Sequence, residues 1–172
     1  MVAALVLLWT VPVTAQPVPE NWKPVRDARG LCQIAVPPEW APLEGSSGAA
    51  VLRDSSTAVA AVTSQPGQPF RPLTESLLRL LAVPKERMFE NSAKRVFYQD
   101  KVSRNAEDPN GFSSSVPAKG GTCSCRVSAV PAIPVSTART IALSLAPVTD
   151  EEGDKPRLRT SAQGGSLVAG GR

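Results

Sequence analysis

The sequence predicts a single α+β domain built on a mostly antiparallel sheet flanked by helices. Short runs in which apolar and polar residues alternate, typical of strands, follow one another between turn-forming residues. Two segments, 72–83 and 137–146, are expected to be helices instead. The 172 residues are 42% hydrophobic and 20% charged, as in one ordinary globular domain, and 17 prolines with 12 glycines favour turns and short strands.

Residues 1–15 are expected to be a secretory signal peptide that is cut after Ala15. The segment carries no charge and has an apolar stretch from Val2 to Trp9, too short to span a bilayer, which needs about 20 apolar residues. The usual basic start is missing, since the first basic residue is Lys23. A buried N-terminal strand is the alternative.

The rest of the chain divides into three parts. Residues 16–21 form a polar linker, and residues 22–147 hold all the apolar periodic segments and are expected to form one domain. Residues 148–172 lack aromatic side chains and are rich in Gly, Ser and charge, which predicts a disordered tail.

The first half of the domain has the pattern of strands. Strands are predicted over 22–26 and 31–36 around the turn "DARG", with Cys32, Ile34 and Val36 on one face of the second strand. "AAVLRDSSTAVAAVTSQ" predicts two strands around "RDSS", the second apolar enough to lie inside a sheet.

The second half combines helices and hairpins. Leucines at i, i+4, i+7 and i+8 predict a helix from Pro72 to Val83 that packs on the sheet. A strand pair turning near "ENSAK" follows, and then a hairpin of 112–117 and 122–130 joined by "AKGG". The helix predicted over 137–146 has Ser136 available as N-cap and Pro147 as a stop.

The three cysteines are expected to supply one structural disulfide. Alternation places Cys123 and Cys125 on the same core-facing side of their strand, and Cys32 lies on the apolar face of its own strand. In an exported chain, a bridge from Cys32 to Cys123, or alternatively to Cys125, should form and persist. A redox role for the C-x-C pair is the competing hypothesis.

The residue types argue against several chemistries. With no histidine, the chain lacks the usual general base, and three cysteines fall short of the usual four zinc ligands. The carboxylates form no recognisable acid/base pair or calcium loop, and "GGTCSC" is not a phosphate-binding loop. We therefore expect no catalytic residue, metal or cofactor.

The net charge of +4 comes from one region, 71–104, which contains eight basic and four acidic residues. This region is a possible interaction surface for an unknown protein or an anionic envelope polymer. The alternative is a solvated face with interleaved charges. Nucleic acid is disfavoured, because stacking aromatic residues do not accompany the charges. The basic residues are Arg71, Arg79, Lys85, Arg87, Lys94, Arg95, Lys101 and Arg104.

Together, "GLCQIAVPPEW", the leucine-rich helix, "ENSAKRVFYQDK", the cysteine strand and "TIALSLAPV" resemble small exported bacterial proteins with a PsbP-like fold. The resemblance covers about Trp22 to Pro147 and implies an antiparallel sheet flanked by helices. Members are generally non-enzymatic accessory or binding modules, so no catalytic residue is carried over. Cys125 has no place in the pattern.

The sequence thus predicts an exported, periplasmic or secreted, non-catalytic accessory or binding module of the cell envelope. One alternative is a small extracytoplasmic enzyme that uses carboxylates or a free thiol. Another is a carrier of an apolar ligand, which requires a cavity between the sheet and a helix.

Overall fold

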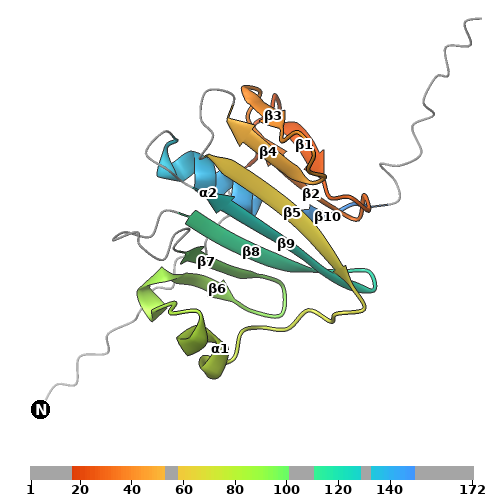
Figure 1. The fold of residues 1–172 in the computed structure, drawn as a ribbon. Coiled ribbons are helices and arrows are strands. Elements are labelled where there is room, and N and C mark those ends of the chain that lie inside the picture. Colours follow the sequence, from red (N-terminus) through yellow and green to blue (C-terminus); the bar gives the residue numbers. More distant parts are fainter. Residues whose placement is uncertain (1–16, 53–57, 101–110, 129–132, 150–172) are drawn as a thin grey trace, which may run out of the picture.

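The computed structural model describes residues 17–52, 58–100, 111–128 and 133–149 (Figure 1). The predicted signal peptide, the turn "RDSS", nearly all of the predicted tail, Lys101 and Arg104 therefore lie outside the described residues.

A seven-stranded antiparallel sheet forms the centre of the fold, in the order β3-β4-β5-β9-β8-β7-β6. The hairpin β8–β9 and the strand pair β6–β7 are those expected from the sequence, so the mostly antiparallel α+β architecture is confirmed. The strands are β3 (Trp40–Pro42), β4 (Ala49–Leu52), β5 (Val59–Pro66), β6 (Met88–Asn91), β7 (Val96–Asp100), β8 (Gly111–Ala118) and β9 (Gly121–Ser128).

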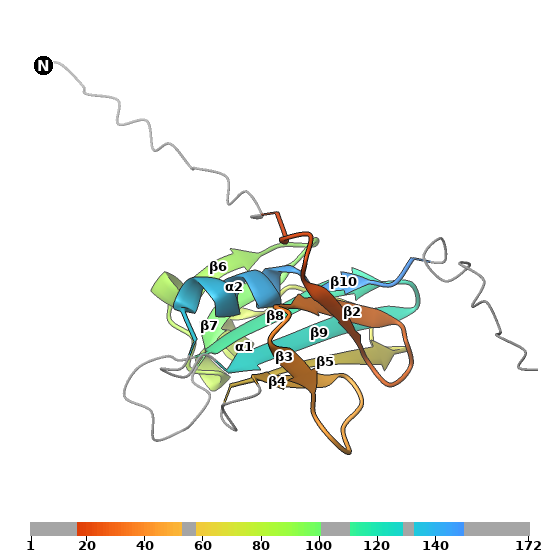
Figure 2. The ribbon, with the colours of Figure 1, turned by 90° about the horizontal axis from the view of Figure 1, so that it is seen from above.

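A smaller antiparallel sheet and one helix cover one face of the large sheet (Figures 1 and 2). The small sheet has the order β1-β2-β10, with β1 (Lys23–Arg26), β2 (Cys32–Val36) and β10 (Ala146–Pro147). Helix α2 (Val135–Leu143) packs beside it against β8 and β9. The core lies between these two layers.

Alternation along the strands decides which side chains enter this core. On β9, Cys123, Cys125 and Val127 are buried, while Arg126 is exposed on the opposite face. Phe97 on β7 and Phe112 on β8 stack in the core with their ring centroids 5.8 Å apart. On β2, where Cys32, Ile34 and Val36 are buried, and on β9, the apolar pattern predicts the buried side correctly.

The prediction of a helix from Pro72 to Val83 packed on the sheet is wrong in extent and in packing. Helix α1 spans only Glu75–Leu80, and none of its residues is buried. Thr74 caps its start, and Ala82, with a φ of 51°, turns the chain after its end into the 3-10 turn η1 (Lys85–Arg87). Because β2 and α2 already occupy the core face, the leucines of α1 have no core to enter, and Leu80 is 80% exposed.

The second helix is shifted from its predicted position. It starts directly after Pro134, which makes no side-chain cap, so the prediction of Ser136 as N-cap is wrong. Pro147 is not the stop either, because α2 ends at Leu143 and Pro147 pairs with Cys32 in β10. The hydroxyl of Ser144 instead bonds to the Ile141 carbonyl and accepts the Ala35 N–H. These bonds tie the helix end to β2.

The two layers are joined covalently by a disulfide between Cys32 and Cys123, whose Cα atoms lie 5.6 Å apart. Of the two partners that the sequence leaves open, the structure pairs Cys123, and Cys125 is the free thiol. Cys32 is the first residue of β2, and Cys123 lies near the end of the β8–β9 hairpin. Cys125 lies two residues further along β9 and points at the same layer.

Replacing both Cys32 and Cys123 with alanine should lower the free energy of unfolding by about 4 kcal/mol, because the bridge restricts a loop of roughly ninety residues in the unfolded chain. Urea unfolding measures the change. Cys125→Ala keeps the bridge and should cost much less. Equal stability of the reduced and oxidised wild-type protein would contradict this prediction.

Candidate functional site

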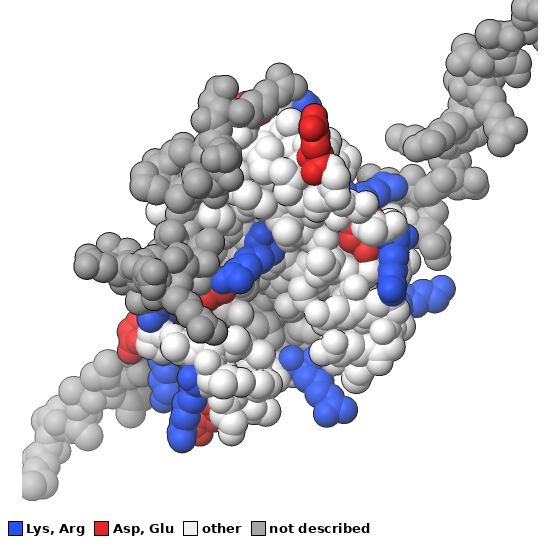
Figure 3. Space-filling model, viewed as in Figure 1, with Lys and Arg blue, Asp and Glu red and all other residues white. Residues whose placement is uncertain are grey.

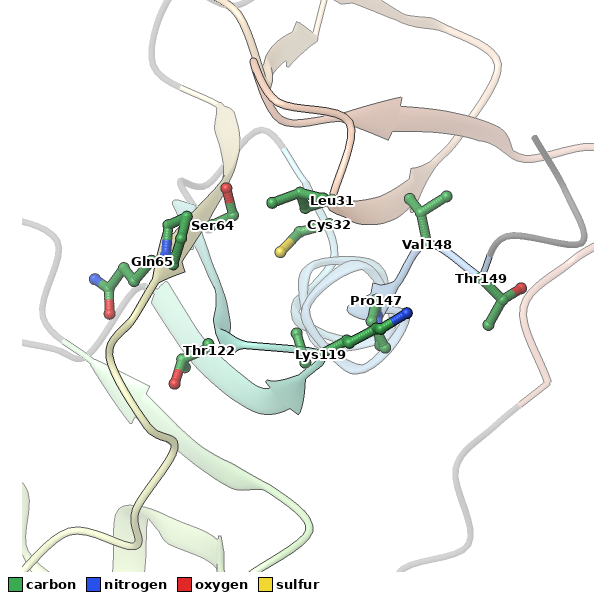
Figure 4. A pocket seen from close by; sticks show the side chains of 12 residues that line it. Leu31, Cys32, Ser64, Gln65, Lys119, Thr122, Pro147, Val148 and Thr149 are labelled. Carbon is green, nitrogen blue, oxygen red and sulfur yellow. The ribbon is translucent and has the colours of Figure 1, made fainter.

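An apolar hollow lies at one open end of the layered structure, between the large sheet and the small sheet (Figure 4). We call it the end cleft. Its walls come from the start of β2, the end of β5, the β8–β9 turn and the chain that follows β10; the lining residues fall within 31–32, 64–66, 118–122 and 147–149. Its volume of about 350 Å³ falls within the range of small-molecule pockets, roughly 300–1,000 Å³.

The lining of the end cleft is mainly apolar with one charge. Leu31, Ala118 and Val148 contribute aliphatic surface from three different segments. Lys119, in the tight turn between β8 and β9, is the one charged residue among the lining residues of the described chain. Figure 4 shows its side chain extended from that turn toward the segment that holds Pro147 and Thr149. The cleft is therefore apolar inside with a cation at one wall.

A buried carboxylate supports the inner wall of the cleft. Asp27 accepts hydrogen bonds from the N–H groups of Leu31 (2.8 Å) and Cys32 (2.9 Å) and from the hydroxyl of Ser64 (2.5 Å). Burial raises the pKa of the Asp27 carboxyl, but the Ser64 hydroxyl and the backbone N–H donors outweigh it, so the pKa lies below its ordinary value. The ionised Asp27 thus ties the β1–β2 turn to β5.

Gly121 allows the outer wall to form. A Cβ atom at this position would lie 2.4 Å from the carbonyl oxygen of Gln65, so any side chain would push β9 away from β5. The strands pair down to Pro66 and Gly121, and Gly67 then bonds to the carbonyl of Gly120. The wall is closed by backbone contact rather than by side chains.

A second hollow, the α1 groove, lies on the opposite face of the large sheet. It has a volume of about 760 Å³ and runs between residues 80–83 and the outward-facing side chains of β7, β8 and β9. Asp100 forms an ion pair with Arg126 (3.0 Å) and accepts a hydrogen bond from Ser113 (3.3 Å). Burial, and to a smaller extent the charge of Asp100, raises the pKa of Tyr98. Among the described residues that line the groove, Asp100 is the one carboxylate, and it is ion-paired.

Two members of the predicted interaction surface have partners within the described chain. Arg79 pairs with Glu75 on α1 (2.7 Å), and Arg95 donates to the carbonyl of Leu145 (3.4 Å). In Figure 3 the Lys and Arg side chains are scattered over the face shown, with uncharged surface between them. The described members are Arg71, Arg79, Lys85, Arg87, Lys94 and Arg95. Their role in binding stays a prediction.

The free thiol is not available for chemistry in the folded protein. Cys125 is buried in the core opposite Val62 and Ser114, and burial raises its pKa to about 12. Since the thiolate is the reactive form, this position does not suit a nucleophile or a redox partner. Within the described residues, no cluster of three or more Cys, Asp or Glu could hold a metal ion.

Comparison with known proteins finds no family model that matches the chain and no matching sequence among the curated proteins. Among the described helices, neither is long and apolar enough to cross a membrane.

Sequence reasoning did not find the end cleft. It located three of the walls, at the start of β2, the end of β5 and the β8–β9 turn, but it used Pro147 as a helix stop and assigned 148–149 to the disordered tail, whereas these residues line the fourth wall. The hairpin turn "AKGG" put Lys119 at a strand end, and "DARG" put Asp27 at a turn, but nothing in the sequence shows that these turns meet. An acidic residue just before an Arg-Gly turn is the one local signal, because Asp side chains often bond to backbone N–H groups there.

Burial of Cys125 predicts the pattern of thiol labelling. At neutral pH, iodoacetamide should not modify the folded protein within minutes, because little thiolate is present. Unfolding without reduction should expose one thiol, and unfolding with reduction three. Mass spectrometry counts the added groups. Fast labelling of Cys125 in the folded protein would contradict its burial.

Asp27→Asn should lower the free energy of unfolding at pH 7 by about 1–3 kcal/mol, since it removes a charged acceptor of several hydrogen bonds. Because the pKa of Asp27 is lower in the folded state, its contribution is complete above the unfolded value of about 3.9 and is lost as the pH falls through the folded value. The difference from wild type should therefore shrink below about pH 4. Urea unfolding at several pH values measures it.

The matched control is Glu44→Gln, at an exposed position, which should have little effect at any pH. A difference between wild type and Asp27→Asn that stays constant from neutral to strongly acidic pH would show that the charge of Asp27 does not stabilise the fold.

Proposed function

We propose that this protein is an exported, non-catalytic binding module of the cell envelope, and that it binds an apolar small molecule in the end cleft. The observation that carries the proposal is the cleft itself. It is an aliphatic hollow of ligand size, held open between two sheets by a disulfide and a buried carboxylate. Of the functions that the sequence leaves open, this one combines a binding module with a carrier of an apolar ligand.

Export is part of the proposal and is supported by the disulfide. A buried bridge that links two layers forms and persists where the surroundings are oxidising, as in the periplasm or outside the cell. The apolar, uncharged start of the chain is a further argument. The PsbP-like assignment also belongs to the proposal and rests on the residues quoted in the sequence analysis.

Two sites weigh against the enzyme alternative as it was formulated, with a free thiol or paired carboxylates. Cys125 has no access to solvent that would let it react, and Asp100 in the α1 groove is bound to Arg126. A partner protein or anionic polymer at the basic residues of 71–104 is compatible with a binding module. The end cleft has the more definite geometry.

Binding of an uncharged dye tests the proposed site. N-phenylnaphthylamine, which fluoresces in apolar surroundings, should bind the purified oxidised protein. Leu31→Gln should weaken this binding about fivefold, because it removes apolar contact area at the cleft wall. Leu31 is 45% exposed, so the substitution leaves the core intact.

Two control variants separate the cleft from other apolar surface. Leu43→Gln changes a similarly exposed leucine (37%) outside the cleft, and Leu80→Gln removes the most exposed leucine of α1. Neither should alter the affinity. If Leu31→Gln left the affinity unchanged, or if only Leu80→Gln weakened the binding, the end cleft would not be the binding site.

A further inference from the structure

We infer that the ligand of the end cleft is a medium-chain amphiphile with an anionic head group, whose chain enters the cleft and whose head group binds the ammonium of Lys119. This inference rests on the proposed function and specifies its ligand class.

The size and lining of the cleft indicate what the apolar part of the ligand is. At about 350 Å³, the cleft lies near the lower end of the range for small-molecule pockets, which favours a medium-length chain over a long lipid tail. Leu31, Ala118, Pro147 and Val148 offer aliphatic contacts from different segments of the chain. A flexible saturated chain matches this lining.

The charge at the wall of the cleft indicates what the head group of the ligand is. Among the described residues that line the cleft, Lys119 is the only charged one, and the turn that carries it is fixed by backbone bonds on both strands of the hairpin. The carboxylate of Asp27 does not oppose this cation from within the cleft, because it is already bonded to Ser64 and to backbone N–H groups. An anionic head group therefore suits the wall and a cationic one does not.

Lys119 also makes an interaction of its own in the structure. A bound head group would share the ammonium, whose three N–H donors can serve more than one acceptor. The hydroxyl of Thr122 donates to the carbonyl of Gln68 and does not compete for the head group. Selectivity for the anion is thus expected to depend on one side chain.

Three ligands with the same chain and different head groups test the inference by calorimetric titration: octanoate, octanol and octylammonium. The wild-type protein should bind octanoate about fivefold more tightly than octanol, and this preference should decrease as salt is added. Lys119→Gln should remove the preference, and Lys119→Glu should reverse it in favour of octylammonium. Lys119 is exposed, so neither change should affect folding.

Lys94→Gln is the matched control, because Lys94 is an exposed lysine in the β6–β7 turn, outside the cleft. Its preference for octanoate should equal that of wild type. If octanoate and octanol bind equally well and Lys119→Gln changes nothing, the inference is overturned, while the proposed apolar site stands. If none of the three ligands binds and the uncharged dye also fails to bind, the proposed function is overturned as well.

Discussion

The attachment of β2 to the centre of the large sheet is the constraint on which the rest of this structure depends. Two links attach β2 and its preceding turn to the large sheet. They lie side by side, because Ser64 on β5 and Cys123 on β9 are direct partners in the sheet register. Ser64 bonds to Asp27 in the β1–β2 turn, and Cys123 is bridged to Cys32 at the start of β2. One link is covalent and the other is a charge-assisted hydrogen bond.

The end cleft exists because the large sheet continues past this level. Beyond Ser64 and Cys123, β5 and the β8–β9 hairpin extend to Pro66 and Gly121 and remain paired. The small sheet has ended there, apart from the chain that leaves β10 and binds Leu31 through the Val148 N–H. Strand pairing, the disulfide and the hydrogen bonds of Asp27 thus hold the described walls of the hollow in place. Such preorganisation favours binding, because little ordering is required when a ligand enters.

The two faces of the large sheet have different roles. The inner face is filled by β2 and α2, and its burial supplies the hydrophobic stabilisation. The outer face carries Ser113, Ser124 and Arg126 and adjoins α1, whose leucines remain exposed. On α2, the guanidinium carbon of Arg139 lies over the ring of Phe89, 4.9 Å from the ring centre. This is a cation–π contact between the helix and the large sheet.

The amino-acid sequence by itself determined most of the strands, with β3 and β10 missed, and the buried faces of β2 and β9, because side-chain alternation is a local property of extended chain. It placed Cys32, Cys123 and Cys125 toward the core correctly, and it located the β8–β9 hairpin and the β6–β7 pair. It overestimated α1, because leucine spacing shows that a helix has an apolar side but not whether a core remains for that side to enter.

Only the tertiary structure decided the pairing of Cys32 with Cys123, the short strand β10 and the end cleft. Each depends on how far β2 lies along β9, a distance between segments about ninety residues apart that no local pattern encodes. A two-residue strand that contains Pro147 has no periodicity to detect. Asp27 and Lys119 belong to turns that are unremarkable in sequence, and they acquire a role because the two layers bring both turns to the same end of the molecule.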